Sequence, residues 1–326
     1  MYPMKLRPVL KDIIWGGVRL AGEYKKGAPG QRIAESWELC VHPNGVNIIE
    51  NGDFAGKTLE QLFNADKSIV SPYYGAEKFP VLIKFIDAAQ DLSVQVHPDD
   101  AYAAKHAGEL GKTEMWYIID AEPGARLAYG LNADYTRGEL EHYIKAGEFE
   151  RCLNYVGVKP GDIFFIPAGL VHAIGAGILL AEVQQNSDTT YRLYDYNRPG
   201  ADGSPRELHV NQGLDVCIKS KSEYNNMQGG SILANLAECE YFSVTRHVIG
   251  KMAGDFLSTN LTMHLAGHFV SIICVDGKGK IICGGERYNI SKGDSYFIPG
   301  GVDNIKISGR LDLICTGSGS DRHKYI

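Results

Sequence analysis

One short stretch decides the fold of this 326-residue chain, namely residues 161–169 with the sequence Gly161-Asp162-Ile163-Phe164-Phe165-Ile166-Pro167-Ala168-Gly169. Glycine and proline near its ends predict two turns, and the apolar residues between them predict a short buried strand. The pattern returns at residues 293–301 as Gly293-Asp294-Ser295-Tyr296-Phe297-Ile298-Pro299-Gly300-Gly301. A repeat of this kind indicates two related β-units. At the same offset, His172 of the first copy corresponds to Asn304 of the second.

Short apolar runs bounded by Gly, Pro, Asn and Asp recur on both sides of that stretch. We predict strands at 46–50, 81–87, 93–97, 115–119, 163–167, 178–184, 242–248, 269–275 and 295–299. Many short strands at this spacing favour a mainly β fold with two jelly-roll β-barrel domains over a doubly wound α/β fold.

Helical signals interrupt the first unit. Thr136 and Glu139 resemble a capping box that opens a helix over 139–146, and residues 147–156 suggest a second amphipathic helical segment. The predicted parts are a first domain over 1–210 with a small helical insertion at about 132–156, a helical or irregular bridge over 211–240 and a second domain over 241–326.

The composition limits the partners. A formal net charge of −6 gives no basic surplus for binding nucleic acid. No apolar stretch approaches the length of a membrane span, and the first residues lack the apolar core of a signal peptide. The seven cysteines include no Cys-x-x-Cys pair, so we expect reduced, packed thiols. We predict a cytoplasmic monomer or homodimer that binds neither nucleic acid nor membrane.

Four polar residues are expected to converge in the first unit: Gln95, His97, Glu114 and His172. Gln95 and His97 alternate with apolar residues, so both side chains project from one face of a strand. Glu114 opens an apolar run, and His172 follows the strand and turn quoted above. Two imidazoles, a carboxylate and an amide oxygen can bind one metal ion and leave a position open, which is typical of catalytic zinc. Because Asn304 replaces the imidazole, only the first unit should hold the metal.

A series of motifs runs in one order through the first part of the chain. They are Trp15-Gly16-Gly17, Glu35-Ser36-Trp37-Glu38, Leu82-Ile83-Lys84-Phe85-Ile86-Asp87-Ala88, residues 92–100, Lys112-Thr113-Glu114-Met115-Trp116 and Gln185-Asn186-Ser187-Asp188-Thr189-Thr190-Tyr191-Arg192. In this order they resemble type I mannose-6-phosphate isomerase, and the length resembles its short bacterial form. The resemblance implies two cupin-like jelly-roll barrels, of which the first carries the metal.

The resemblance also implies an activity and a set of site residues. It implies a zinc-dependent enzyme, with one Zn²⁺ per chain, that interconverts mannose 6-phosphate and fructose 6-phosphate. It places the zinc ligands on Gln95, His97, Glu114 and His172, the catalytic arginine on Arg192, and further pocket residues on Ser93, Lys84, Lys112 and Glu182. From about residue 211 on, the chain matches only as a second β-domain and adds no site residue.

The implied reaction moves a proton between C2 and C1 of an open-chain sugar phosphate. The enediolate carries negative charge on oxygen, which a divalent ion can stabilise as a Lewis acid. Arg192 can add a permanent positive charge and directional donors, although an ion pair with Asp188 or Asp195 would give it a purely structural role. We expect Lys84 and Ser93 to hold the phosphate at the rim of the pocket.

The general base is left open among three groups. Lys112 lies two residues before Glu114, so an extended backbone puts both side chains on one face, and a nearby metal can lower the pKa of the lysine toward neutrality. Glu182, on the predicted strand 178–184, offers a carboxylate. A metal-bound hydroxide is the third candidate.

Two other functions fit part of the same pattern. Two histidines and a carboxylate on a cupin barrel also form the facial triad of a non-haem iron oxygenase. A non-catalytic cupin that senses sugar phosphates would bind its ligand tightly without turnover. Gln95 as a fourth ligand and the cations Lys84, Lys112 and Arg192 favour the isomerase.

Overall fold

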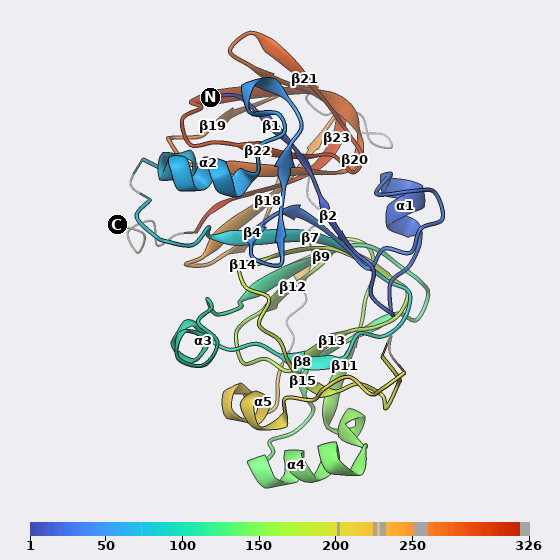
Figure 1. Cartoon of the computed structure of the whole chain (residues 1–326). Coiled ribbons are helices and arrows are strands. Elements are labelled where there is room, and N and C mark those ends of the chain that lie inside the picture. The colour runs from blue at the N-terminus through green and yellow to red at the C-terminus, as the bar shows by residue number, and fades with distance from the viewer. Residues whose placement is uncertain (73, 201–202, 224–226, 229–232, 251–259, 320–326) are drawn as a thin grey trace.

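The computed structural model describes residues 1–319 except residue 73 and the segments 201–202, 224–226, 229–232 and 251–259. Two β-units lie one above the other in Figure 1, with the first unit in the lower half and the C-terminal unit in the upper half. Strands dominate, and the helices are short, so the expectation of a mainly β fold is confirmed. No helix among the described residues combines the length and the apolar character needed to cross a bilayer.

The first unit consists of two antiparallel sheets that pack against each other. The larger sheet has the order β16 (Met227–Gln228), β12 (Asp162–Ile166), β9 (Glu114–Ala121), β14 (Ile178–Gln185), β7 (Val81–Ala88), β3 (Glu35–Leu39) and β2 (Val9–Lys11). The smaller sheet has the order β11 (Leu153–Gly157), β10 (Arg126–Leu131), β13 (His172–Ile174), β8 (Val94–Val96) and β15 (Tyr191–Tyr194). Apolar side chains from both sheets, including Trp116, Leu127 and Ile174, pack into one core.

Strand β14 is buried along its whole length because it lies between the two units. Leu180 packs in the core between the two sheets of the first unit. Leu179, Ala181 and Val183 belong to a second core, which they share with side chains of the C-terminal unit such as Phe297. Burial on both faces explains why this segment reads as a nearly continuous apolar run in the sequence.

The C-terminal unit is an antiparallel sheet that also takes in strands from the first part of the chain. Its order is β17 (Leu233–Glu238), β18 (Phe242–Ile249), β23 (Asn304–Ser318), β20 (Val270–Cys283), β22 (Ser295–Ile298), β1 (Met4–Arg7) and β6 (Ile48–Ile49), with β19 (Asn260–His264) paired to β23 and β21 (Glu286–Ser291) paired to β20. Met4 of β1 pairs with Phe297 of β22, and Figure 1 shows this blue strand among the orange ones. The first and last parts of the chain therefore share one sheet.

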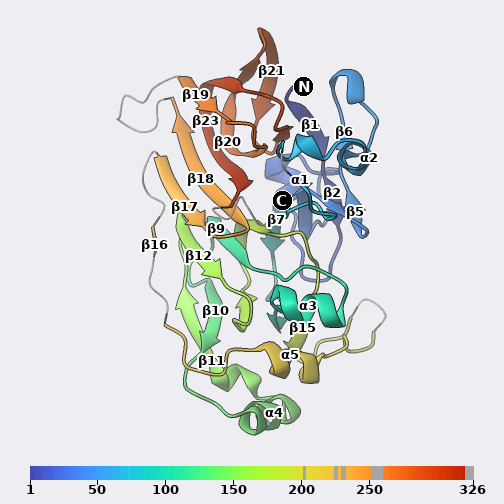
Figure 2. The same ribbon diagram turned by 90° about the vertical axis from the view of Figure 1, so that its left-hand side faces the viewer.

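Helices and short turns cover the outside of the sheets. They are α1 (Arg19–Tyr24), α2 (Leu59–Ala65), α3 (Asp100–His106), α4 (Arg137–Ala146) and α5 (Val210–Val216), with 3-10 turns at Gly52–Phe54, Lys67–Ile69 and Phe149–Cys152 and a small hairpin of β4 (Val41–His42) and β5 (Gly45–Val46). The predicted capping box is present, since the side chains and backbone N–H groups of Thr136 and Glu139 bond reciprocally. Figures 1 and 2 place α4 and α5 at the far end of the first unit from the C-terminal sheet.

Two predicted segments have a different structure. Residues 147–156, expected to be helical, form a 3-10 turn followed by β11, because Gly147 takes a left-handed conformation (φ 71°) that ends α4. The expected bridge over 211–240 contains α5 but also β17, whose residues pair with β18 in the C-terminal sheet. Pairing with a neighbouring strand overrides the helical preference of Leu, Ala and Glu in this segment.

Strand β20 is longer than expected because an apparent turn is a bulge. Asp276 and Gly277 read as the end of a strand, yet β20 continues to Cys283. The register shifts between Cys274 and Asp276, and Gly277 takes φ 91°. A Cβ at position 277 would lie 2.1 Å from the carbonyl oxygen of Arg310, so only glycine fits this close approach.

Candidate metal centre and substrate cavity

Neighbouring strands of the smaller sheet place Gln95, His172 and Arg192 side by side. Gln95 on β8 lies opposite His172 on β13 and opposite Arg192 on β15. Ser93 precedes β8 and His97 follows it, and residues two apart in an extended segment project from the same face. The alternation seen in the sequence therefore directs Ser93, Gln95 and His97 toward the space between the sheets.

The larger sheet supplies the residues that face them. Glu182 on β14 lies opposite Lys84 on β7 and opposite Trp116 on β9. Glu114 is the first residue of β9, two residues before Trp116, and so lies on the same face. The carboxylates of Glu114 and Glu182 both enter the interior of the first unit, where both residues are almost completely buried.

Three of the four predicted metal ligands meet at one point. One ligand atom from each of His97, Glu114 and His172 lies within 4.8 Å of the others. His172 Nε2 is 3.3 Å from Glu114 Oε1, and His97 Nε2 is 3.7 Å from Glu114 Oε2. A buried carboxylate between two imidazoles is unfavourable unless a cation compensates its charge.

Backbone carbonyl groups determine which nitrogen of each histidine is available. His97 Nδ1 lies 2.9 Å from the carbonyl oxygen of Thr189, and His172 Nδ1 lies 2.9 Å from that of Leu170. A carbonyl oxygen can only accept, so each Nδ1 carries a proton and donates it, and each Nε2 keeps its lone pair. Both lone pairs are on the side of Glu114, an orientation typical of histidines that bind metal ions.

Gln95 and Lys112 border the same point. The Gln95 amide lies 3.3 Å from His172 Nε2, and its oxygen can take that place when the amide is turned over, because the two ends have nearly the same shape. Lys112 Nζ lies 3.0 Å from both His97 Nε2 and Glu114 Oε2. The ammonium group thus contacts two of the atoms that would hold a metal cation.

The protonation states also suit a divalent cation. Burial raises the pKa of Glu114 to about 7, and the nearby Glu182 carboxylate acts in the same direction. Burial lowers the pKa of His172 to about 4, and burial together with Lys112 lowers that of His97 well below its ordinary value. Within the described structure, neither oxygen of Glu114 accepts a hydrogen bond of good geometry. Neutral imidazoles beside a buried carboxylate that has only the Lys112 ammonium as a charged partner fit a bound metal ion.

A cavity of about 330 Å³ opens beside the metal centre. This volume is in the range of small-molecule sites. The predicted site residues that line it are Lys84, Ser93, Gln95, Lys112, Glu182 and Arg192. His97, Glu114 and His172 do not line the cavity but adjoin it through Gln95 and Lys112, so the structure brings all nine predicted site residues into one region.

Lys84 and Glu182 form a buried ion pair in the cavity wall. Lys84 Nζ lies 3.1 Å from Glu182 Oε1 and 5.4 Å from the centre of the Trp37 ring, and Trp116 Nε1 donates to Glu182 Oε2 at 2.8 Å. Burial favours a raised pKa for Glu182, but the charges of Lys84 and Lys112 outweigh it and hold the pKa below its ordinary value. The carboxylate is therefore ionised at neutral pH. Lys84 is almost completely buried in the cavity wall, and its expected role in holding the phosphate stays a prediction.

Arg192 reaches the cavity from the opposite sheet. Its Nε donates to Ser93 Oγ at 3.3 Å, and its Nη1 donates to the carbonyl oxygen of Glu207 at 2.8 Å. Among the described residues, it makes no ion pair with Asp188 or Asp195, and Asp195 pairs with two other arginines. The structural ion pair considered for Arg192 is thus absent, and its guanidinium group borders the cavity.

Sequence reasoning missed four polar residues that also line the cavity: Glu35, Asp188, Thr190 and Arg206. Glu35 Oε2 lies 3.7 Å from Lys84 Nζ, and Asp188 accepts a hydrogen bond from Asn44. Glu35 and Asp188 lie in motifs quoted above, but only the pairing of distant strands brings them to the cavity. No local spacing predicts that placement.

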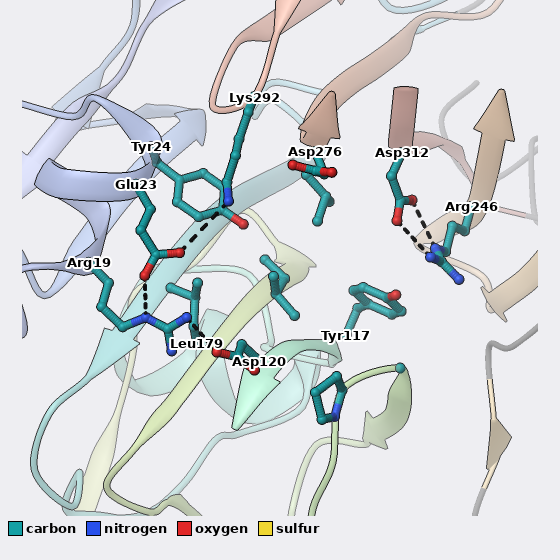
Figure 3. A pocket seen from close by; sticks show the side chains of 14 residues that line it. Arg19, Glu23, Tyr24, Tyr117, Asp120, Leu179, Arg246, Asp276, Lys292 and Asp312 are labelled. Carbon is teal, nitrogen blue, oxygen red and sulfur yellow. Dashed lines mark hydrogen bonds and ion pairs between the residues drawn. The ribbon is translucent and has the colours of Figure 1, made fainter. Parts of the chain in front are cut away.

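A larger cavity, of about 480 Å³, lies between the two units and does not include any predicted site residue (Figure 3). Its charged side chains are largely paired with one another, as Arg19 is with Glu23 and Asp120, and Arg246 is with Asp312. It lies on the face of β9 that carries Tyr117, opposite to the face of Glu114. The larger volume of this cavity therefore does not coincide with the predicted site residues.

Two packed sheets around a buried set of two histidines and a glutamate define the class of this protein, a cupin with the features of a metal site. Residues 4–122 match the family model described as phosphomannose isomerase type I, catalytic domain. Residues 232–317 match that described as mannose-6-phosphate isomerase, cupin domain.

Relatives match over nearly the whole chain. Mannose-6-phosphate isomerase ManA of Bacillus subtilis is 43% identical over 318 residues, which cover 96% of this chain and 98% of that protein. Mannose-6-phosphate isomerase of Streptococcus mutans is 37% identical and covers 97% and 98%. The crystal structure of mannose 6-phosphate isomerase from Bacillus subtilis matches with a TM-score of 0.85, 33% identity and coverage of 97% and 99%. The chain belongs to the type I mannose-6-phosphate isomerase family.

Proposed function

We propose that this chain interconverts mannose 6-phosphate and fructose 6-phosphate with one zinc ion held by Gln95, His97, Glu114 and His172. The observation that carries the proposal is the meeting of two Nε2 lone pairs and a buried carboxylate beside a cavity with several cationic side chains. Membership of the family supports the aldose–ketose reaction. The names of the relatives give no support to an iron oxygenase or a sugar-sensing cupin.

The chain prepares the centre for a divalent cation in a dry environment. When bound, such an ion supplies a Lewis acid that stabilises negative charge on the substrate oxygens. The carbonyl groups of Thr189 and Leu170 orient the imidazoles, and Glu114 contributes negative charge. Gln95, His97, Glu114 and His172 would hold the ion, and such a ligand set would let it also bind a substrate oxygen, as in catalytic sites.

Arg192 supplies a second positive charge at the cavity. Ser93 and Glu207 hold its Nε and Nη1, and its Nη2 has no hydrogen-bond partner among the described residues. A guanidinium group held in this way can donate to substrate oxygens without first losing much rotational freedom. Its role is to stabilise the enediolate and to orient the open-chain sugar.

Glu182 and Lys112 divide the proton transfers. The ionised carboxylate of Glu182 can remove the proton from C2 of the aldose and return it to C1. Lys112 can transfer the proton between the neighbouring oxygens, since its ammonium group lies at the junction of the cavity and the metal centre. Lys84 keeps Glu182 charged, and with Ser93 it lines the space for the substrate.

The decisive experiment is a coupled assay for fructose 6-phosphate formed from mannose 6-phosphate. The protein is assayed as purified, after chelation and after zinc is restored. Turnover that is lost and regained in this order supports the proposal, and no turnover in a folded, zinc-loaded sample would refute the substrate assignment. In deuterated water, Glu182→Gln should abolish incorporation of deuterium at C2 while zinc remains bound.

A further inference from the structure

The segment that carries Lys112 and Glu114 is held from behind by a polar network that the reaction itself does not use. Asp100, the first residue of α3, accepts hydrogen bonds at Oδ1 from the backbone N–H of Gly111 at 2.7 Å and from Gln185 Nε2 at 2.9 Å. One carboxylate oxygen thus contacts both the segment before β9 and the end of β14. These two strands carry the proposed ligand Glu114 and the proposed base Glu182.

Gln185 extends the network to the residue beside the metal ligand. Its Oε1 accepts the backbone N–H of Thr113 at 2.9 Å, and its own N–H donates to the Thr113 carbonyl oxygen at 3.1 Å. Because Oε1 accepts from a backbone N–H, the other end of the amide must be the donor to Asp100. The orientation of Gln185 and the acceptor role of Asp100 are therefore mutually consistent.

The packing leaves this segment little room to shift. Lys112 donates its backbone N–H to the carbonyl oxygen of Pro98 at 3.0 Å, which ties it to the residue after His97. A Cβ at Gly111 would lie 2.6 Å from the backbone nitrogen of Asp100. The two segments are therefore in direct backbone contact, and Asp100 lies against the residue that precedes Lys112.

The second unit reaches the same carboxylate. Tyr241 lies in the turn between β17 and β18, and its hydroxyl donates to Asp100 Oδ2 at 2.9 Å. Asp100, Gln185 and Tyr241 also line one cavity of about 370 Å³, on the side of the network away from the metal centre. The C-terminal unit thus contributes a hydrogen bond to the support of a site that it does not enter.

We propose that Asp100 is a positioning residue of the metal centre, which holds the Gly111–Glu114 segment against His97 and is itself supported by Tyr241 of the second unit. The kinetic part of the proposal rests on the proposed isomerase reaction, and its metal-binding part rests only on the proposed metal site. Second-sphere partners of metal ligands typically contribute about 10- to 100-fold to metal affinity or activity. Asp100 acts through Lys112 and Glu114 and does not touch the substrate.

The test compares Asp100→Ala and Asp100→Asn with a matched control, Asp99→Ala. Asn keeps an acceptor for Gly111 and Gln185, and its amide can donate to the Tyr241 oxygen, so it should preserve zinc affinity and kcat within about threefold. Asp100→Ala should weaken zinc affinity and lower kcat, each by about 10-fold or more, with KM nearly unchanged. Asp99 caps α3 through the N–H of Tyr102 but lies outside the network, so Asp99→Ala should leave both quantities unchanged.

Zinc affinity is measured by competition with a chelator, and thermal unfolding verifies that each variant is folded. Tyr241→Phe, which removes only the hydroxyl, should produce a smaller change in the direction of Asp100→Ala. Unchanged zinc affinity and kcat in a folded Asp100→Ala variant, or equal losses in Asp99→Ala, would overturn the proposal. If the wild type binds zinc but does not turn over mannose 6-phosphate, the proposed function fails, whereas the zinc affinities still decide the role of Asp100.

Discussion

The two β-units contain the same turn, but the strand that follows the turn enters different surroundings. Gly161 and Gly293 take nearly equal φ angles of 92° and 88°. The next residue in each copy, Asp162 or Asp294, accepts a hydrogen bond from a backbone N–H three residues earlier, at 2.9 and 2.8 Å. The local structure of the repeat is therefore equivalent in both units.

The two units differ at the residue that lies three positions after the repeated stretch, which is His172 in the first unit and Asn304 in the second. In the first unit His172 is buried and pairs with Gln95, beside the candidate metal centre. In the second unit the corresponding Asn304 is exposed and pairs with the exposed His264. The interior of the second unit is filled by apolar side chains such as Ile298 and Ile307. The turn is the same in both units. The side chains of the neighbouring strands determine whether the interior of the unit contains a polar metal centre or an apolar core.

The largest expected effect separates His172 from its counterpart. His172→Ala should remove tight metal binding and lower kcat/KM by about 1000-fold or more, since a metal ion contributes several kcal/mol to stabilising the transition state. Asn304→Ala, the matched control, should keep one metal ion per chain and full turnover. Metal analysis and the coupled assay measure both, and equal losses in the two variants would contradict the comparison.

Two arginines, one from each unit, are expected to have different roles. We expect the arginine of the first unit to affect turnover and that of the second unit to affect stability. Arg192→Ala should retain zinc but lower kcat by about 100-fold, because a directional donor to the developing negative charge is lost. Arg246→Ala should leave kcat unchanged and lower the free energy of unfolding by about 2 kcal/mol or more, because Asp312 loses its partner in a nearly buried ion pair. Steady-state kinetics and denaturant unfolding distinguish the two outcomes. A large fall in kcat for Arg246→Ala would contradict the assignment of turnover to the first unit alone.

The zinc affinity of the first unit should also depend on pH. Zinc affinity should fall by about tenfold per pH unit below pH 7, because a proton competes for Glu114, whose pKa in the metal-free protein is about 7. His172, with a pKa of about 4, stays neutral over this range. Chelator competition between pH 5 and 8 measures the slope, and an affinity independent of pH would contradict it.

The pKa shifts of Glu114 and His172 also change the stability of the metal-free protein, in opposite directions as the pH changes. The pKa of Glu114 is raised on folding, so its contribution to stability is present at low pH and is lost as the pH rises through about 7. The pKa of His172 is lowered, so its contribution is present above about 6.5 and is lost as the pH falls toward 4. Stabilisation by added zinc should therefore increase from pH 6 to pH 8.

The smallest expected effect on turnover comes from the core of the second unit. Ile307→Ala creates a cavity at a fully buried position and should lower the free energy of unfolding by about 2–5 kcal/mol. Turnover of the folded variant at 25 °C should stay within about twofold, because Ile307 belongs to a core that contains none of the predicted site residues. Loss of zinc from folded Ile307→Ala would show that the apolar core of the second unit also affects the metal centre of the first unit.

Much of this arrangement follows from the sequence because the signals are local. Alternating polar residues place Ser93, Gln95 and His97 on one face, and residues 161–169 carry the turn signals of a short strand. The family resemblance supplied Arg192 and the pocket residues. Their meeting point depends on register, for example Glu182 opposite Lys84, which local spacing does not specify.

The segments that differed from expectation were governed by distant contacts. Gly277 reads as a turn, but the backbone of Arg310 passes so close that the glycine belongs to a bulge. Residues 233–238 were expected to be helical or irregular, but they pair with β18 and form a strand of the C-terminal sheet. Asp100 lies in the motif of residues 92–100, but nothing in that motif predicts its contacts with Gly111, Gln185 and Tyr241, which join three separate parts of the chain.

The pairing of β1 with β22 has a consequence for biosynthesis. Met4 and Lys5 of β1 are synthesised about 290 residues before their partners Phe297 and Tyr296 in β22. At 5–20 residues per second, roughly 15–60 s pass before this strand can find its neighbour. During that time its hydrogen-bonding edge needs protection, by the ribosome surface or by a chaperone. A chain cut between the two units would expose the edge of β1 in one fragment and the edge of β22 in the other, and exposed edges favour aggregation.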